Sequence, residues 1–159
     1  MSAISAERPD LLPPARKLEV EQQLLRIAKS SAFSASPRCQ QLLSYLVNQS
    51  IAGAYDLLRE RVVGAEVFGR DVDYDTGGDS IVRVRANDVR KRLAQYYDGA
   101  PGRDREIRIH LPTGSYVPEF NFPVFYATEP AKLELSIPNK AKPEGVRGLG
   151  RTAWTVVAV

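Results

Sequence analysis

The clearest pattern along the chain is a stripe of apolar residues at helical spacing within residues 80–97. The stripe consists of Val82, Ala86, Val89, Leu93, Tyr96 and Tyr97. Because side chains three, four or seven positions apart lie on one side of an α-helix, this spacing predicts a helix with one buried face. Asp79 and Ser80 supply candidate N-caps, and Gly99 and Pro101 predict where the helix ends.

Two short segments of alternating polarity follow this helix. Residues 105–111 alternate charged and apolar side chains in the period of a half-buried strand, and residues 115–120 can return beside them. The turn formers Pro112 and Gly114 lie between the two segments. A helix followed by a hairpin is typical of a winged helix-turn-helix, so residues 105–120 are the predicted wing.

Further helices are predicted before residue 80. Apolar spacing predicts one over 18–30, a second over 37–53 that begins with a proline, and a short third over 57–68. Gly64 weakens the third helix by about 1 kcal/mol relative to alanine. Residues 70–79 are rich in turn formers and predict the connection into the helix at 80–97. The predicted fold class is therefore α+β, mostly α with a small β wing.

The two ends of the chain lack this globular pattern. Residues 1–16 hold three prolines and little apolar periodicity, which predicts a disordered leader. The winged-helix domain is expected over 17–125, followed by a Pro/Lys-rich linker over 126–152. The apolar run at 153–159 is too short to cross a bilayer, which takes about 20 residues. In a longer chain it would begin a transmembrane helix, with the basic residues before it on the cytoplasmic side.

The overall composition adds little to these predictions of fold and domain organisation. The 159 residues are 43% hydrophobic and 26% charged, as expected for one globular domain with appended segments. The net charge of +3 says little about nucleic acid, so local clusters matter more. The lone Cys39 excludes an intrachain disulfide, and the N-terminus shows no secretory signal. We expect a cytoplasmic domain, anchored at the inner membrane if the terminal apolar run continues.

The faces of the 80–97 helix outside its apolar stripe are strongly basic. They carry Arg83, Arg85, Arg90, Lys91 and Arg92 against the single acid Asp88. A solvated face is the common explanation of such a charge run. DNA contact is favoured here because the helix immediately precedes the predicted hairpin.

The segment Val82-Arg-Val-Arg-Ala-Asn-Asp-Val-Arg-Lys-Arg-Leu93, followed by Gly114-Ser-Tyr116, resembles the winged-helix DNA-binding domain of OmpR/PhoB-type response regulators over residues 40–120. Recognition helices of that family read Val-x-Val-x-Ile-x-x-Leu-Arg-Lys-x-Leu, and their wings read Gly-x-Gly-Tyr. Here the helix at 18–30 stands in place of the four-stranded sheet that opens those domains. The domain order is also similar to that of membrane-tethered regulators of the ToxR/CadC kind.

The resemblance implies that one set of side chains faces the major groove or neighbouring phosphates: Arg83, Val84, Arg85, Asn87, Asp88 and Arg90. We expect Arg83, Val84, Arg85 and Asn87 to read bases, and Arg90, Lys91 and Arg92 to contact phosphates. The candidate contacts of the wing are Arg108, His110, Thr113 and Ser115. The expected partner is double-stranded DNA, with a second copy of the chain on the DNA as a further candidate. Regulation of transcription is the implied role.

Other chemistries have weaker support. His110 is the only histidine, and Cys39 is most simply a buried hydrophobe. The acids of 71–79 lack the glutamate that an EF-hand places six residues after its glycine, where Arg83 stands, so we expect turn and cap roles. We predict no cofactor, no metal site and no enzyme activity. The open alternatives are a protein-interaction module for an acidic partner or neighbouring domain, and a piece of an enzyme whose catalytic parts follow residue 159.

Overall fold

A computed structural model describes residues 9–123 of the chain. These residues belong to one compact unit. The first residues of the predicted leader, the predicted linker and the terminal apolar run lie outside the described residues.

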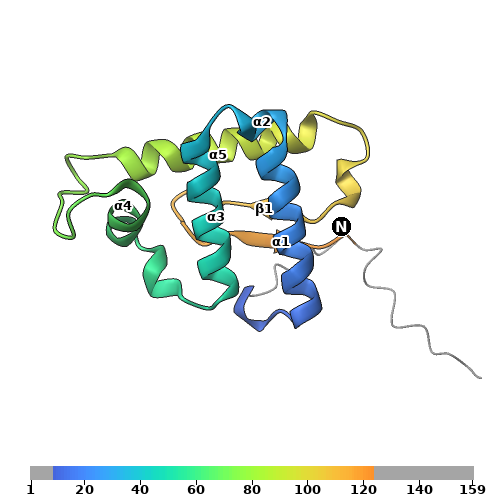
Figure 1. Ribbon diagram of the computed structural model, residues 1–159, viewed down its shortest axis with the longest axis horizontal. Helices are drawn as coiled ribbons and strands as arrows, with labels where there is room; N and C mark the ends of the chain where they lie inside the picture. The colour runs from blue at the N-terminus through green and yellow to red at the C-terminus, as the bar shows by residue number, and fades with distance from the viewer. Residues whose placement is uncertain (1–8, 124–159) are drawn as a thin grey trace, which may run out of the picture. The chain divides into compact units, whose positions relative to one another are not determined.

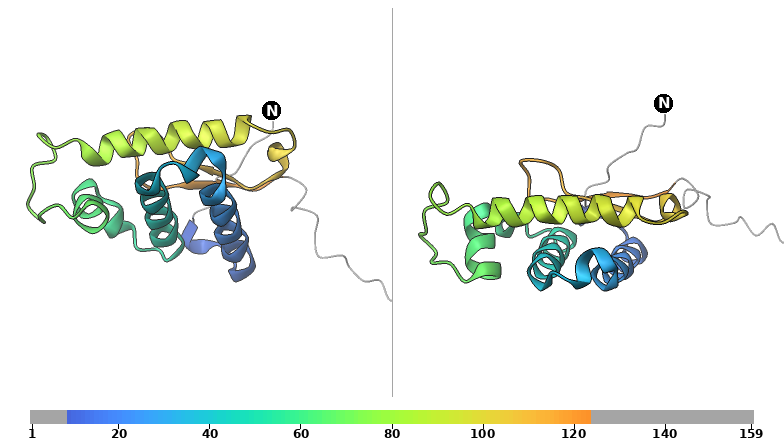
Figure 2. Two further views of the ribbon diagram at one scale, coloured as in Figure 1. Left: turned by 45° about the horizontal axis from the view of Figure 1, so that its top comes forward. Right: turned by 90° about the horizontal axis from the view of Figure 1, so that it is seen from above.

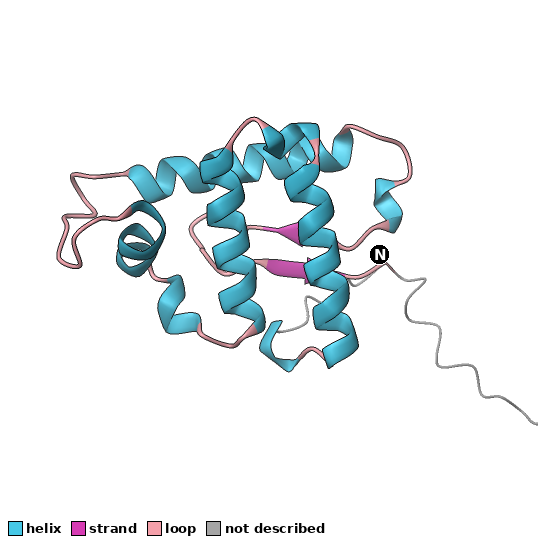
Figure 3. Ribbon diagram, viewed as in Figure 1, coloured by secondary structure: helices cyan, strands magenta, loops and turns pink. Residues whose placement is uncertain are grey.

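The described part is mostly helical, with one small sheet. The elements in chain order are η1 (Pro9–Leu11), α1 (Pro14–Lys29), α2 (Ser31–Ser34), α3 (Pro37–Ile51), η2 (Tyr55–Leu58), α4 (Glu60–Phe68), α5 (Ile81–Asp98), η3 (Arg103–Arg105), β1 (Arg108–His110) and β2 (Glu119–Asn121). Helices α1 and α3 lie side by side, and α5 crosses them near one end (Figure 1). Turning the molecule shows α5 along its whole length at this end, with α1 and α3 below it (Figure 2). The two strands lie behind α1 and α3 (Figure 3).

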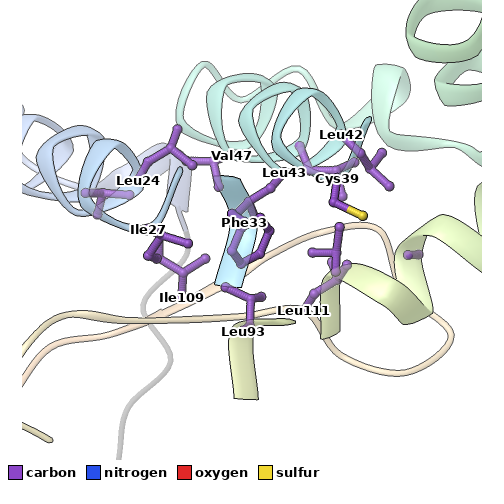
Figure 4. Packing of buried hydrophobic residues seen from close by; sticks show 14 of the residues in the cluster. Leu24, Ile27, Phe33, Cys39, Leu42, Leu43, Val47, Leu93, Ile109 and Leu111 are labelled. Atoms are coloured by element: carbon purple, nitrogen blue, oxygen red, sulfur yellow. The ribbon is translucent and has the colours of Figure 1, made fainter. Parts of the chain in front are cut away.

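The apolar stripe of α5 is buried along its whole length, as predicted. It packs mainly against α3, with further contacts to α2, α4 and β1. Phe33 of α2 lies within this core and is fully buried among Leu43, Leu93 and Leu111 (Figure 4). A helix of four residues has no periodicity to reveal it, and α2 was not predicted from the sequence.

The N-terminal boundary differs from the prediction of a leader over residues 1–16. The chain is folded from Pro9, which opens the short helix η1, and Leu12 is buried with only 4% of its surface exposed. Helix α1 begins at Pro14 rather than at residue 18. Proline at the first helical position lacks only an N–H that would have no partner within the helix, so it starts a helix readily. The prolines that suggested disorder are thus part of the folded domain.

The segment predicted as one helix over 57–68 is divided. Arg59 adopts an extended backbone with ψ of 143° and separates η2 from α4. Gly64 of α4 has a packing role: a Cβ built there would lie 2.2 Å from the hydroxyl oxygen of Tyr74. Tyr74 belongs to the loop before α5, and its hydroxyl donates to the carbonyl of Glu60 at 3.3 Å. The glycine therefore makes room for the loop to dock on α4.

The predicted hairpin is present, with shorter strands than the alternation suggested. Strands β1 and β2 pair antiparallel with Ile109 opposite Phe120, and both of these side chains face the core. Residues 111–118 form the connection between the strands. The α+β class is thus confirmed for residues 9–123, while the finer assignment to winged helices stays a prediction. Within those residues, no helix combines the length and apolar character that a membrane span requires.

Candidate nucleic-acid interface

Helix α5 presents a line of exposed side chains opposite its buried stripe. Val84, Asn87, Lys91 and Gln95 succeed one another at spacings of three and four residues, and each is exposed. Val84 keeps 50% of its surface accessible, although it is apolar. The N-cap residue Ser80 makes no side-chain cap hydrogen bond, and Oδ1 of the preceding Asp79 accepts one from the backbone N–H of Ile81 at 3.0 Å. This line, together with the hairpin beside it, is the candidate interface.

Arg83 lies at the edge of this line and is held by the segments before α5. Its Nη2 donates to the carbonyl oxygen of Thr76 at 2.6 Å. Its Nε lies 3.4 Å from Oε1 of Glu60 at the start of α4. Half of the Arg83 side chain remains exposed. The guanidinium is therefore accessible, and its orientation is fixed by protein groups.

Arg85 and Asp88 form an ion pair on the opposite edge of α5. Arg85 Nη1 lies 3.2 Å from Oδ2 of Asp88, one turn further along the helix. Both side chains are partly exposed. Pairs at this spacing in solvent stabilise a helix by only about 0.2 to 0.5 kcal/mol, so the pair is easily exchanged for another partner.

Arg90 is turned away from the outer line and fixes the hairpin. Its Nε donates to the carbonyl of Leu111 at 3.0 Å, and its Nη2 donates to the carbonyls of Pro112 at 2.8 Å and Ser115 at 3.0 Å. Its Nη1 donates to Oδ1 of Asn87 at 2.7 Å. The sequence suggested a phosphate contact for Arg90. In the folded chain its guanidinium instead joins α5 to the turn between the strands.

Arg92, another of the three side chains predicted to contact phosphate, is also hydrogen-bonded within the protein. Its Nη1 donates to the carbonyl oxygen of Ala32 in α2. That contact joins the middle of α5 to the short helix that carries Phe33. Lys91 lies between the two bound arginines in sequence, is exposed, and has no ion pair or side-chain hydrogen bond within residues 9–123. It is thus the phosphate candidate whose charge is free.

The four candidate contacts of the wing are divided between the strand and the turn. Arg108 and His110 point to the exposed side of β1, where His110 Nδ1 lies 3.5 Å from Oε2 of Glu119 on the paired strand. Thr113 is exposed in the turn. Ser115 is half-buried, and its Oγ accepts from the backbone N–H of Val117 at 3.1 Å. Three of the four side chains are therefore accessible, and Ser115 shapes the turn.

Two of the acids before α5, Asp75 and Asp79, accept backbone hydrogen bonds of the turn and helix start, as the sequence predicted for these acids. Both carboxylate oxygens of Asp75 accept backbone hydrogen bonds, from Gly77 at 2.9 Å and Gly78 at 3.0 Å. Asp79 also pairs with Arg70 at 2.7 Å. Over the described range 9–123, no group of three or more His, Cys, Asp or Glu side chains is arranged to hold a metal ion.

Beside Arg83 lie Glu60, which was not singled out from the sequence, and Tyr116, which entered only through the Gly114-Ser-Tyr116 motif. Glu60 and Tyr116 line a hollow of about 330 Å³ together with Arg83, Asn87 and the hairpin turn. Burial, followed by the nearby carboxylate of Glu60, raises the pKa of Tyr116 to about 12. Glu60 and Tyr116 are far apart in sequence from each other and from Arg83, so local pattern gave no signal for this cluster.

Comparison with known proteins adds no relative to this description. No family model, curated protein or solved structure matches the chain.

Proposed function

We propose that residues 9–123 bind double-stranded DNA as a winged helix-turn-helix, with the outer line of α5 in the major groove and the hairpin beside it. The role would be regulation of transcription. The observation that supports this most is the outer line itself, since Val84, Asn87 and Lys91 combine apolar, amide and cationic groups on one exposed helix edge. Base edges and phosphates are read by these types of side chain.

The ion pairs beside the line are compatible with this role. Arg83 and Arg85 each face a carboxylate, from Glu60 and Asp88, but both arginines are more than two-fifths exposed. Exposed ion pairs contribute about 0 to 1 kcal/mol, so a phosphate or a guanine could replace the carboxylate at little cost. We therefore keep Arg83 and Arg85 as candidate base-reading residues.

The proposal assigns different roles to the three side chains that the sequence predicted as phosphate contacts. Lys91 takes the main phosphate contact, with Arg108 and Thr113 on the wing side. Arg90 and Arg92 act by positioning, because their guanidinium groups hold the hairpin and α2 against α5. Asn87 is both a candidate base contact and an acceptor for Arg90, so its amide orientation is set by that hydrogen bond.

The experiment that tests the proposal is a titration of the full chain with fluorescent duplex DNA of mixed sequence. Even binding without sequence preference depends on phosphate contacts and weakens as salt rises. We expect binding at low salt that decreases with salt concentration. A lack of binding to any duplex at low salt would exclude the proposal.

A second function, a protein-interaction module, is favoured by one observation. Leu18 and Leu25 are 55% and 58% exposed and lie seven residues apart on α1, on the side opposite its buried residues. Apolar side chains repeated at this spacing suit contact with another helix. If the full chain bound no duplex DNA, and Leu18→Ser lost a protein contact that the wild type makes, this second function would be favoured.

A further inference from the structure

A groove lies between the second half of α5 and the hairpin, separate from the outer line of α5. It measures about 470 Å³, within the range of about 300 to 1,000 Å³ that is usual for small-molecule sites. On the helix side it is bounded by Leu93, Ala94 and Tyr97, and on the hairpin side by β1 and Asn121. The groove is thus large enough for a ligand of modest size.

The base of the groove is apolar. Leu93, Tyr97, Ile109 and Leu111 all line it and all belong to the hydrophobic core, so their positions are fixed by packing. Tyr97 is held further by its hydroxyl, which donates to the carbonyl of Ile107 at 3.0 Å and accepts from the N–H of Ile109 at 2.8 Å. A preformed apolar base favours a ligand with a flat hydrocarbon or aromatic body.

The rim of the groove is basic. Arg90, Arg108 and His110 line it, and within residues 9–123 no aspartate or glutamate does, although Glu119 lies 3.5 Å from His110. Arg90 donates to three hairpin carbonyls and to Asn87, and forms a fixed wall. Arg108 is accessible, because its side chain is 56% exposed and its only ion pair among the described residues is a long one of 4.0 Å to the exposed carboxylate of Asp98. Its guanidinium lies 5.0 Å from the ring centre of Tyr97, at the end of the apolar base.

We propose that this groove binds a small organic anion with an apolar body, such as an aromatic carboxylate. The carboxylate would pair with Arg108, with His110 and Thr113 beside it, while the body would lie on Leu93 and Tyr97. A guanidinium can bind a carboxylate through two parallel hydrogen bonds, which fixes the orientation of the ligand. The groove uses the second half of α5 but shares Arg108, His110 and Thr113 with the proposed wing contacts, so its ligand is tested in the absence of DNA.

The test is an NMR titration of the full chain, without DNA, with three probes: 1-naphthoate, neutral 1-naphthalenemethanol and inorganic phosphate. We expect saturable one-to-one binding of naphthoate with shifts at the amides of Ala94, His110 and Asn121. The neutral alcohol should bind at least about tenfold more weakly, since the charged hydrogen bond to Arg108 is lost. Phosphate should also bind weakly, because it has no apolar body.

Two variants locate the site. Arg108→Gln should weaken naphthoate about tenfold, and Ala94→Tyr should abolish binding by filling the groove from an exposed helix position. Lys17→Gln on α1 removes a charge elsewhere and should leave affinity unchanged. Spectra of each variant show whether it is folded. Unsaturable shifts, an affinity unaffected by both groove variants, or equal affinity for phosphate and naphthoate would each overturn the proposal. None of these outcomes bears on DNA binding, which is measured separately.

Discussion

The Nε of Arg90 donates to the carbonyl oxygen of Leu111 at 3.0 Å, and this contact links the most basic helix of the domain to its hairpin. With the bonds to Pro112 and Ser115, one guanidinium satisfies three carbonyls of the turn between β1 and β2. Strands of three residues form few ladder hydrogen bonds, so such a hairpin needs support from outside. Arg90 supplies it.

Replacing Arg90 should therefore destabilise the fold. Hydrogen bonds from a charged group contribute about 1.5 to 3 kcal/mol, and Arg90→Gln would leave carbonyls of the turn without a donor. We expect the free energy of unfolding in urea to fall by about 2 kcal/mol. Lys91→Gln, one residue away and exposed, should change it by less than about 0.5 kcal/mol. Equal losses in the two variants would show that Arg90 does not anchor the hairpin.

The effect of Gly64→Ala on stability should change sign when the side chain of Tyr74 is removed. In the native chain, Gly64→Ala should destabilise by about 1 to 3 kcal/mol, because the added methyl group meets the Tyr74 ring. In a Tyr74→Ala background the same change should be neutral or stabilise by up to about 1 kcal/mol, since alanine is the better helix former. Urea unfolding of the four proteins measures this coupling. Additive effects would mean that the loop before α5 does not dock on α4.

Tyr97 should make stability depend on pH in the alkaline range. Burial raises its pKa from 10.0 to about 12 in the folded chain. The folded state therefore holds the phenol proton more tightly than the unfolded state. This contribution is fully present below pH 10 and is lost as pH rises from 10 towards 12. A shift of this size corresponds to about 2 to 3 kcal/mol.

The comparison of wild type with Tyr97→Phe isolates this contribution from the other tyrosines and the lysines. Unfolding free energies measured at intervals from pH 9 upward should fall more steeply for wild type than for Tyr97→Phe. Parallel curves would contradict the raised pKa of Tyr97.

Local pattern predicted the parts of the fold that depend on local spacing. The stripe of α5 repeats over several turns, and its burial followed from the sequence alone. Helix α2 and the start of α1 were missed because one is too short for a periodicity and the other begins at prolines that also occur in disordered segments. Helix ends and short elements depend on capping and packing more than on period.

The roles of individual arginines could not be predicted in the same way. Arg90 and Arg92 look equivalent to Lys91 in sequence, yet their acceptors lie 21 to 25 residues away for the hairpin and 60 residues away for Ala32. Which cation finds a protein carbonyl is decided by tertiary packing. Val84 is different, because its place off the apolar stripe already indicated an exposed side chain, and it is exposed.

The central claim, that the outer line of α5 binds DNA through Lys91, is tested most directly by the salt dependence of duplex affinity. Fluorescence anisotropy of a labelled duplex should be measured over a series of salt concentrations for wild type, Lys91→Gln and Lys17→Gln. Lys17 lies near the start of α1, the end away from α5 (Figure 1). We predict that Lys91→Gln weakens binding and reduces the slope of log affinity against log salt by about one, while Lys17→Gln leaves it unchanged. Equal slopes for all three proteins, or no binding at low salt, would contradict the claim.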